Sequence, residues 1–326
     1  MLGTFTRIVR DLVFLTGGSG FVGAHVLRAL LAAGYRVRAL ARGPMAPIDG
    51  CEIVSGDLAR PGTLARTLEG CRYLVHCAAQ YSFGPRERDA IRRTNVLGTE
   101  GLFAAAYLAG VERAVLTSSS ATLGGETHVV SARALDYHSS KIAQERVAFA
   151  SRLPTIAVLP TAPVGTGDWK PTPTGAMIVD FMRGKMIARP PASGGMNLVD
   201  VEQVAEAHVA ALERGSIGER YVIGGENFTF DALWDLLAEF TGRAAPRVRA
   251  PIALMYAAAW LDEARCRITG ATPFVPLEGV RMSQRAMFVD AVDSMPAEHA
   301  LGVRARPVLD ALVNAIVWYR DHGYAA

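Results

Sequence analysis

The chain has few cysteines, little net charge and no long hydrophobic run, and each of these absences excludes a class of protein. Its 326 residues contain four cysteines, without metal-ligand spacing (Cys51, Cys71, Cys77 and Cys266). Reduced cysteines that pack in the core are typical of cytoplasmic proteins, and no metal site is expected. The net charge of +3 includes no long run of one sign, so nucleic acid is not an expected partner.

Membrane and export signals are also lacking. No stretch reaches the roughly 18 apolar residues that span a bilayer, and residues 1–10 lack the apolar core of a secretion signal. We therefore expect a cytoplasmic protein without membrane insertion. The very apolar segment 251–261 ends at the charged sequence Asp-Glu-Ala-Arg, which predicts a buried or interface helix. With 50% apolar and 20% charged residues, the composition is globular.

The best-defined motif is a short apolar strand followed by three regularly spaced glycines. Residues 12–15 predict a buried strand, Gly17, Gly20 and Gly23 follow it, and residues 24–33 have helical periodicity. Gly17 permits the tight turn, Gly20 lets the backbone approach a pyrophosphate, and Gly23 lets the helix pack closely against the strand. The free N–H groups and the positive dipole end of that helix would hold the pyrophosphate. The motif therefore predicts a dinucleotide site.

Strands and helices alternate through the first half of the chain. This alternation predicts parallel strands joined by right-handed crossovers, and hence an α/β fold: a doubly wound parallel sheet (Rossmann fold) with helices on both faces. We expect residues 1–160 to form the dinucleotide-binding domain. The predicted strands are residues 12–15, 36–41, 52–55, 73–79, 113–117 and 155–159, and the predicted helices are 24–33, 61–69, 86–109 and 136–152.

Beyond residue 160 prolines become frequent and the pattern changes. We expect residues 161–326 to form a smaller, mostly helical substrate-binding region over the carboxyl ends of the strands, partly returning to the main sheet. Its predicted strands are residues 196–199 and 220–223, and its predicted helices are 174–184, 201–214, 229–241, 251–268 and 307–322.

The residues with catalytic potential follow the strand at 113–117. That strand is followed by a run of serines that ends at Ser120, and Tyr137 comes seventeen residues later. Lys141 follows Tyr137 by four residues, so the two side chains lie on one face of a helix. A tyrosine with a pKa of about 10 carries protons poorly at neutral pH, and a nearby ammonium lowers that pKa toward the working range. The hydroxyl of Ser120, or alternatively that of Ser119, would hydrogen-bond the same substrate oxygen.

Further short motifs accompany these residues. They are Gly56-Asp57-Leu58, His76-x-Ala78-Ala79 and Asn95-Val96-x-Gly98-Thr99. Together with the glycine motif, the serine run and Tyr137-x-x-x-Lys141, they resemble the extended short-chain dehydrogenase/reductase family of the NAD-dependent epimerase/dehydratase type. The likeness covers nearly the whole chain.

This resemblance implies roles for individual residues. By likeness, Tyr137 is the general acid/base, Lys141 holds the nicotinamide ribose and lowers the pKa of Tyr137, and Ser120 orients the substrate oxygen. A homodimer through the long helices at 86–109 and 136–152 is also implied. The residues expected to contact the cofactor are Gly17, Gly20, Phe21, Val22, Gly23, Arg42, Asp57, Leu58, Ala78, Lys141 and Pro160, with Asp57 and Leu58 beside the adenine.

The nature of the substrate is suggested by finer likenesses. Segments at 170–175, 197–199 and 224–227 are similar to the group labelled hopanoid-associated sugar epimerases, and the related dihydroflavonol reductases act on less polar compounds. Sugar-nucleotide enzymes of the family commonly place an arginine against the diphosphate, and residues 195–198 contain none. Residues 123–125 also read Leu-Gly-Gly instead of the usual Val-Tyr-Gly. Three aromatic residues flank the expected cleft, and we expect them to line an apolar substrate pocket: Tyr81, Phe83 and Trp169.

The end of the second strand favours NADP over NAD. An acidic residue there would bind the ribose 2′-hydroxyl of NAD, whereas arginine favours the 2′-phosphate of NADP. Residues 36–42 contain no acid and end in arginine, so we expect Arg42 to bind the phosphate, with Arg38 as the second choice. NAD is the alternative cofactor.

The sequence thus predicts an NADP(H)-dependent oxidoreductase that interconverts a ketone and a secondary alcohol on a moderately apolar small molecule. A sugar or nucleotide-sugar epimerase would use the same residues, but it would return the hydride from a tightly bound NAD(P). A non-catalytic dinucleotide sensor is the third hypothesis, and the retention of Ser120, Tyr137 and Lys141 argues against it.

Overall fold

A computed structural model gives the fold of most of the chain. It describes residues 11–60, 62, 64–81, 88–123, 137–189, 194–271, 273, 277–284 and 286–325, and every structural statement below concerns these residues. Within helices and strands, the description excludes the side chains of Arg88, Tyr137, Glu278, Met282, Ala286, Ala291 and Val292.

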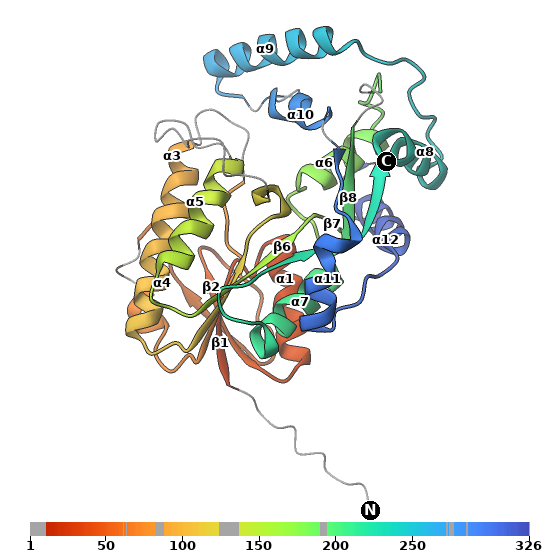
Figure 1. Cartoon of the computed structure of the whole chain (residues 1–326). Helices are drawn as coiled ribbons and strands as arrows, with labels where there is room; N and C mark the ends of the chain where they lie inside the picture. Colours follow the sequence, from red (N-terminus) through yellow and green to blue (C-terminus); the bar gives the residue numbers. More distant parts are fainter. Residues whose placement is uncertain are drawn as a thin grey trace, which may run out of the picture.

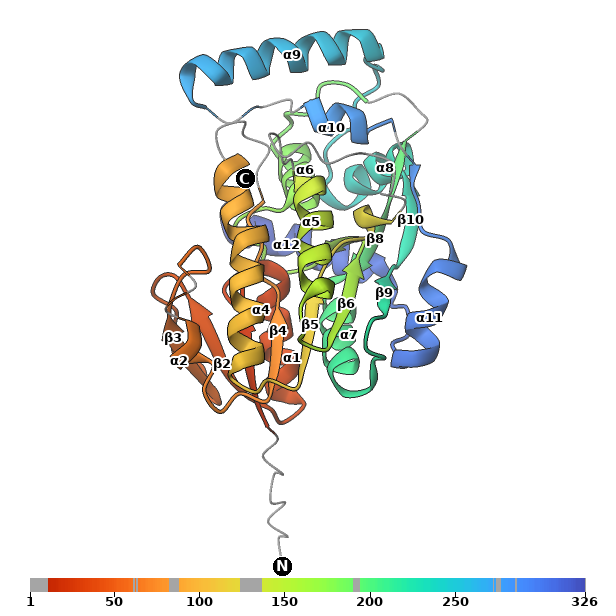
Figure 2. The same cartoon turned by 60° about the vertical axis from the view of Figure 1, so that its left-hand side comes forward.

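A seven-stranded parallel sheet forms the centre of the molecule (Figures 1 and 2). The strand order is β3-β2-β1-β4-β5-β6-β9, so the order reverses between β1 and β4. Open α/β sheets bind ligands at such a reversal, outside the carboxyl ends of the strands. The strands are β1 (Leu12–Thr16), β2 (Arg36–Ala41), β3 (Cys51–Ser55), β4 (Tyr73–His76), β5 (Arg113–Thr117), β6 (Thr155–Pro160) and β9 (Arg220–Ile223).

Helices cover both faces of this sheet, which explains why its central strands are continuously apolar. Side chains alternate along β1: Val13 and Leu15 pack with α1 (Phe21–Ala32) and α7 (Val201–Arg214), whereas Phe14 faces the opposite side. There Phe14 joins the core beneath α4 (Gly98–Leu108), which lies beside α5 (Tyr137–Ala150) in Figure 2. Shorter elements on the way are α2 (Leu64–Thr67), α3 (Arg88–Ile91), the π-helix η3 (Arg92–Leu97) and the 3₁₀ turn η4 (Ser120–Thr122).

A second, smaller sheet is built from the later part of the chain. In this sheet β8 (Gly195–Asp200) pairs with the three short strands β7 (Ala162–Val164), β10 (Glu226–Thr229) and β11 (Ala286–Met287). A separate core, which includes the stacked rings of Phe181 and Trp234, lies against it. The helices of this half are α6 (Pro173–Met182), α8 (Phe230–Thr241), α9 (Ile252–Thr269), α10 (Leu277–Met282), α11 (Ala291–Leu301) and α12 (Val308–Asp321).

The predicted fold class is confirmed: the chain forms a doubly wound parallel sheet with a largely helical second half. β9, from beyond residue 160, pairs with β6 in the main sheet. The exact division between residues 160 and 161 stays a prediction.

Three predicted elements differ clearly from the structure. The strand predicted at 73–79 ends at His76, and of the helix predicted at 61–69 the structure describes only the four-residue α2 as α-helix. The helix predicted at 86–109 is divided into α3, the wider π-helix η3 and α4. The described part of the chain has no helix that is both long and apolar enough to cross a membrane.

Candidate active site

The glycine turn after β1 is fixed by close backbone contacts. Gly17 has φ +76°, and a Cβ placed on it would lie 2.6 Å from the amide nitrogen of Ala78, which follows the neighbouring strand β4. A Cβ on Gly23 would lie only 2.0 Å from the carbonyl oxygen of Gly17. Larger residues at either position would therefore push the helix or the neighbouring strand away, as the sequence predicts for a dinucleotide loop.

The first turn of α1 is open to an anion. Gly20 is its N-cap, no side chain caps the helix, and no acidic residue stands in the first turn. The first N–H groups of a helix lack intrahelical partners and carry the positive end of the dipole, so they favour a phosphate group. The turn therefore fits the pyrophosphate of a dinucleotide. Phe21 and Val22, both half-buried, are the first residues of this turn.

Arg42 and Arg38 occupy different environments at the second strand. Arg42 directly follows β2, is exposed and makes no ion pair with any residue that the structure describes. Arg38 is already engaged: its guanidinium donates to Glu52 Oε2 at 2.7 Å and to two backbone carbonyls beside α2. Of the two arginines, only Arg42 has a guanidinium free for a ligand. The second choice for a phosphate ligand, Arg38, instead joins β2 to β3 and α2.

The loop after β3 carries the residues predicted for the adenine. Asp57 accepts a hydrogen bond from the Ala59 amide at 3.0 Å, so its carboxylate organises a local turn. The side chain of Leu58 is buried in the core beneath α4, where its Cβ would lie 3.0 Å from a Cβ placed on Gly98. At these positions the loop offers backbone groups and the partly exposed Asp57 to a ligand.

The serine turn after β5 separates the two candidate hydroxyls. Ser119 is the N-cap of η4, and its Oγ accepts from the Ala121 amide at 3.2 Å. Ser118 is buried and donates to Glu145 Oε2 at 2.5 Å. No described residue hydrogen-bonds the hydroxyl of Ser120, which is half-buried. Ser120 therefore has the hydroxyl best placed to bind a ligand, whereas the other two serines hold the turn.

A buried acidic residue of α5 anchors this turn. Besides Ser118, Glu145 accepts from Thr122 Oγ1 at 3.1 Å, and its second oxygen forms an ion pair with Arg220 of β9. Arg220 also donates to Thr122 Oγ1 at 2.8 Å. Because charged hydrogen bonds are the stronger kind, this network fixes η4 between α5 and the main sheet.

Lys141 is buried beneath the end of β5. Only 3% of it is exposed, and its Nζ donates to the Thr117 carbonyl at 2.7 Å and to Gln144 Oε1 at 2.8 Å. Burial lowers the pKa of Lys141 from 10.5 to about 8, an effect opposed by nearby Cys77 and Glu145. An ammonium has three N–H donors, so one has no partner among the residues that the structure describes.

His76 lies at the end of the apolar strand β4 and is bound by hydrogen bonds within the protein. It is fully buried and hydrogen-bonds Thr16 Oγ1 at 2.6 Å and Thr99 Oγ1 at 2.8 Å. Burial, reinforced by the charge of Lys141, lowers its pKa to about 3, so the ring is neutral. Gln144 lies between His76 and Lys141 and joins the histidine cluster to the lysine.

The π-helix η3 contains Asn95, which belongs to one of the sequence motifs but has no role assigned from the sequence. Asn95 is buried, accepts from the Gln80 amide at 2.7 Å and donates to the Gln80 carbonyl at 3.0 Å. Its amide nitrogen also donates to Ser140 Oγ of α5 at 3.1 Å. Asn95 thereby joins the loop after β4 to the helix that carries Lys141. π-Helical segments are frequent at functional sites.

Several predicted residues are not described. Tyr137 begins α5, but its side chain lies outside the description, and so does Phe83.

The remaining predicted residues are described. Ala78 and Pro160 lie at the carboxyl ends of β4 and β6, at the same edge of the sheet. Trp169 is largely exposed and packs its ring edge against Trp318 of α12.

The residues of the site that sequence reasoning missed are Gln144, Glu145 and Arg220. Gln144 and Glu145 stand three and four residues after Lys141, so helical spacing alone could have placed them nearby. For Arg220, no local signal exists, because its contact depends on β9 returning to the main sheet.

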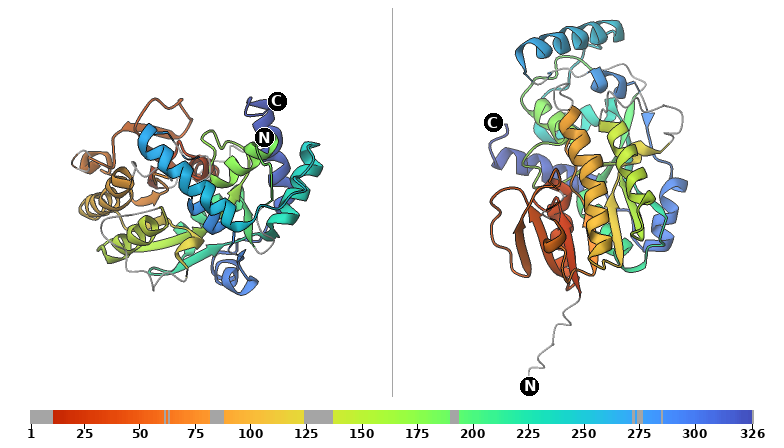
Figure 3. Two further views of the ribbon diagram at one scale, coloured as in Figure 1. Left: turned by 90° about the horizontal axis from the view of Figure 1, so that it is seen from above. Right: turned by 90° about the vertical axis from the view of Figure 1, so that its left-hand side faces the viewer.

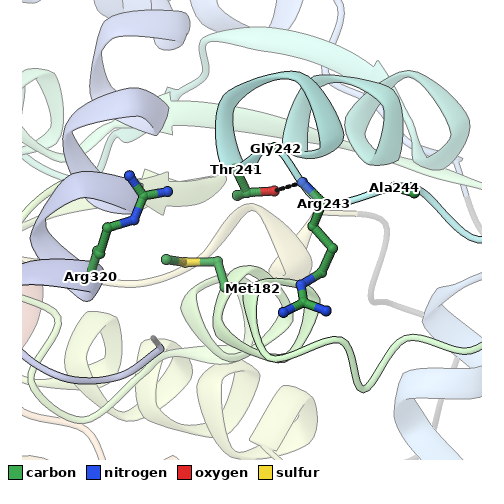
Figure 4. A pocket seen from close by; sticks show the side chains of 6 residues that line it. All are labelled: Met182, Thr241, Gly242, Arg243, Ala244 and Arg320. Atoms are coloured by element: carbon green, nitrogen blue, oxygen red, sulfur yellow. Dashed lines mark hydrogen bonds between the residues drawn. The ribbon is translucent and has the colours of Figure 1, made fainter.

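A cavity of about 370 Å³ lies away from these residues, where α6, α8 and α12 end (Figure 4). Figure 4 shows that Arg320 approaches it from α12 and Arg243 from the segment just after α8, with Met182 between them. It contains none of the residues predicted for the cofactor or for catalysis.

Comparison with known proteins gives consistent results. The family model described as "NAD dependent epimerase/dehydratase family" matches residues 13–224. A dihydroflavonol 4-reductase-like protein of Synechocystis sp. is 38% identical over 96% of this chain and 96% of its own length. Sterol demethylase protein B of Methylococcus capsulatus is 32% identical, covering 95% of this chain and 98% of its own. The crystal structure of gox2253 superposes with a TM-score of 0.79 at 38% identity, covering 97% of this chain and all of that one.

Proposed function

The chain belongs to the NAD dependent epimerase/dehydratase family, and from this premise we propose that it is an NADP(H)-dependent oxidoreductase that interconverts a ketone and a secondary alcohol. The relatives are named as reductases or demethylation proteins, which supports an NAD(P)-dependent enzyme. The observation that carries the proposal is the buried ammonium of Lys141, one helical turn after Tyr137. Two of its three N–H donors are bound by Thr117 and Gln144, and the third has no partner in the described part of the chain.

In the proposed reaction, Tyr137 donates its phenolic proton to the carbonyl oxygen of the substrate. Lys141 stabilises the phenolate that remains, because an opposite charge nearby lowers a tyrosine pKa. Ser120 donates a hydrogen bond to the same substrate oxygen and fixes its position, while Glu145 holds the serine turn. When bound, the nicotinamide supplies the hydride to the carbonyl carbon. The same residues act in reverse for alcohol oxidation.

We assign the cofactor contacts to the residues around the glycine turn. The amide groups of Phe21, Val22 and Gly23 would bind the pyrophosphate, and the third donor of Lys141 would bind the nicotinamide ribose. Arg42 would bind the 2′-phosphate of NADP, because arginine matches phosphate geometry and this arginine is unpaired among the described residues. NAD is the alternative. Asp57, Leu58, Ala78 and Pro160 stay predicted contacts.

We propose a substrate of low polarity. The relatives' names refer to a dihydroflavonol and a sterol, both ring compounds. β8, where sugar-nucleotide enzymes of the family commonly carry an arginine, contains no basic residue. Its Asn197 instead joins β8 to β10, donating to Asn227 Oδ1 at 2.8 Å and accepting from the Gly225 amide at 2.8 Å. A diphosphate would find no cation there.

The test is a substrate screen with both cofactors. The purified protein should consume NADPH with cyclic ketones such as a 3-ketosteroid, and Tyr137→Phe should lower kcat by about 100-fold or more while leaving NADPH affinity nearly unchanged. The conversion of a nucleotide sugar to its epimer without net use of NADPH would identify an epimerase instead. NADPH binding without turnover of any compound by the wild type would favour the sensor hypothesis.

A further inference from the structure

Gln144 is a buried glutamine on the helix that carries Lys141. That helix, α5, stands beside α4 on one face of the main sheet, where the right-hand view of Figure 3 shows it in yellow-green next to the orange α4. Gln144 follows Lys141 by three residues, and only 1% of it is exposed. Burying an amide group is costly unless the group is hydrogen-bonded, so the partners of Gln144 indicate what it does.

These partners fix the orientation of the Gln144 amide. Its Oε1 accepts from Lys141 Nζ at 2.8 Å, and an ammonium can only donate. Its Nε2 lies 3.0 Å from Thr99 Oγ1 and 3.5 Å from the carbonyl oxygen of Ala78, which can only accept. Thr99 donates its own hydroxyl proton to the Asn95 carbonyl at 2.7 Å, so its oxygen is left to accept. Turning the amide over would place donor against donor at the lysine and acceptor against acceptor at Ala78.

The fixed amide in turn fixes the ammonium of Lys141. Besides its bond to Gln144, Nζ donates to the Thr117 carbonyl at 2.7 Å. An ammonium nitrogen is tetrahedral, so its bond to Cε and two bound N–H groups determine the direction of the third N–H. Hydrogen bonds to the charged form of a buried group also favour that form. Gln144 therefore acts on both the direction and the charge of the lysine.

We propose that Gln144 is a positioning residue for Lys141, which aims the third N–H of the ammonium and keeps the ammonium charged. The inference rests on the proposed function, in which Lys141 binds the nicotinamide ribose and assists Tyr137. Gln144 would touch neither substrate nor cofactor, because its side chain is occupied by Lys141 and by the residues beneath α5. Its whole effect on the reaction would pass through the lysine.

The other titratable groups that interact with Lys141 in the described part of the chain are His76 of β4, Cys77 just after it, Glu145 of α5 and His208 of α7. Burial lowers the pKa values of the two histidines to about 3 and about 4, so both rings are neutral. Burial raises the pKa of the cysteine to about 11 and lowers that of Lys141 to about 8. Glu145, paired with Arg220, carries the one charge of these four groups. A neutral acceptor such as Gln144 therefore has a large share in keeping the lysine protonated.

The experiment follows the charge of Lys141 through the free energy of unfolding, which needs no substrate. In the wild type this free energy should rise with pH from about 8, because the unfolded chain then holds a proton that the folded lysine has lost. Gln144→Met removes the acceptor at similar size and should move the start of the rise down by roughly one pH unit, the scale of a hydrogen bond to a charged group. Gln144→Glu supplies a charged acceptor and should move the start up. Subtracting the profile of each protein with Lys141→Met added isolates the lysine.

Gln203→Met is the matched control. Gln203 is likewise buried, 3% exposed, but it hydrogen-bonds the Gly224 carbonyl and the Arg306 amide. This variant should lose stability and keep the start of the rise at about pH 8, which a purely structural role of Gln144 would also predict for Gln144→Met. Circular dichroism verifies that the variants fold.

An unchanged start of the rise in the folded Gln144 variants would overturn the proposal. If the protein reduces a ketone, the pH at which kcat/KM falls should move in the same direction as the start of the rise, and its failure to move would also count against the role of Gln144. A shifted start without turnover of any compound would support this role and contradict the proposed reaction, so the two failures are distinguishable.

Discussion

Lys141 shows how one buried side chain can be both a structural and a chemical group. Two of its three N–H donors are occupied by Thr117 and Gln144, which hold the ammonium at the end of β5. His76, near Lys141, is kept neutral by burial and so adds no second positive charge. The carboxylate of Glu145 favours the charged form of the lysine. The result is a cation whose pKa lies close to the working pH, as proton-transfer sites require.

We therefore predict a pH dependence set by Lys141. The rate of ketone reduction should fall as the pH rises through about 8, because the lysine then loses the charge that lowers the pKa of Tyr137. A pH profile of kcat/KM with NADPH checks this, and a flat profile between pH 7 and 9 would contradict it.

The contribution of Lys141 to the stability of the fold should increase with pH, whereas the reaction rate should decrease. The pKa of Lys141 in the folded protein lies below the ordinary 10.5, so between about pH 8 and 10.5 the unfolded chain holds more protons. This group's contribution to the free energy of unfolding should therefore rise with pH in that window and be constant below it. Comparison of denaturation curves with those of Lys141→Met isolates the contribution.

Arg42 is the residue on which the proposed preference for NADP depends. Arg42→Ala should weaken NADPH binding by about 10- to 100-fold, the loss expected for a charged hydrogen bond, and change NADH binding little. Fluorescence titration of both cofactors measures the two affinities. Arg36→Ala is the matched control, since Arg36 is an exposed arginine at the opposite end of β2. An unchanged NADPH affinity in Arg42→Ala would remove this residue from the site.

At the scale of elements, strand β1, the glycine turn and α1 act as one unit. The close approach of Gly23 to the Gly17 carbonyl fixes the angle at which α1 leaves the sheet, and hence the direction of its free N–H groups. Displacing α1 would disturb both the core formed with Val13 and Leu15 and the phosphate position.

Gly23→Ala tests this coupling. The added methyl group would lie 2.0 Å from a backbone oxygen, so the variant should lose about 1–3 kcal/mol of unfolding free energy and bind cofactor more weakly. Gly43→Ala, where the added Cβ meets nothing within 4 Å, should do neither. Urea denaturation and cofactor titration of the two variants give the answer, and similar behaviour of both would show that packing at Gly23 is not limiting.

The sequence predicts the main sheet well for a physical reason. Its strands are short apolar runs bounded by glycine or polar residues, and β2, β5, α7 and β9 begin and end where the pattern places them. The strands β7, β10 and β11 were not predicted, because each has only two to four residues and exists by pairing with a distant segment. The π-helix η3 was not predicted either; its Asn95 accepts a hydrogen bond from the amide of Gln80, in the loop after β4.

The candidate site divides in the same way. Its glycine motif and the Tyr137–Lys141 spacing are local patterns and can be read directly. The sequence does not show whether Ser119 or Ser120 has the free hydroxyl, because this depends on which of the two caps η4. The ion pair between Glu145 and Arg220 joins residues far apart in the chain and required the fold.

At the scale of the whole molecule, α4 and α5 lie side by side on one face of the sheet (Figure 2). Leu97, Ala104 and Leu108 form an exposed apolar row along η3 and α4, with Leu108 84% exposed. We propose this surface for the homodimer that family resemblance suggests, with the two helix pairs forming a four-helix bundle.

The dimer proposal predicts a native mass twice that of the 34.8 kDa chain. The double substitution Leu97→Glu and Leu108→Glu should yield a monomer, because it places charges in an apolar contact. Size-exclusion chromatography with light scattering measures the mass, and Ile217→Glu, at an exposed residue between α7 and β9, provides a control outside this face. A wild-type chain that is monomeric at micromolar concentration would refute the dimer.

The return of β9 to the main sheet has a consequence for engineering. β6 is buried along its whole length, and β9 supplies the hydrogen bonds on its outer side. A fragment cut near residue 160 would expose that apolar edge, which is a template for aggregation. If the later half of this chain were replaced by that of a relative, residues 220–223 would therefore have to be retained so that β9 still pairs with β6.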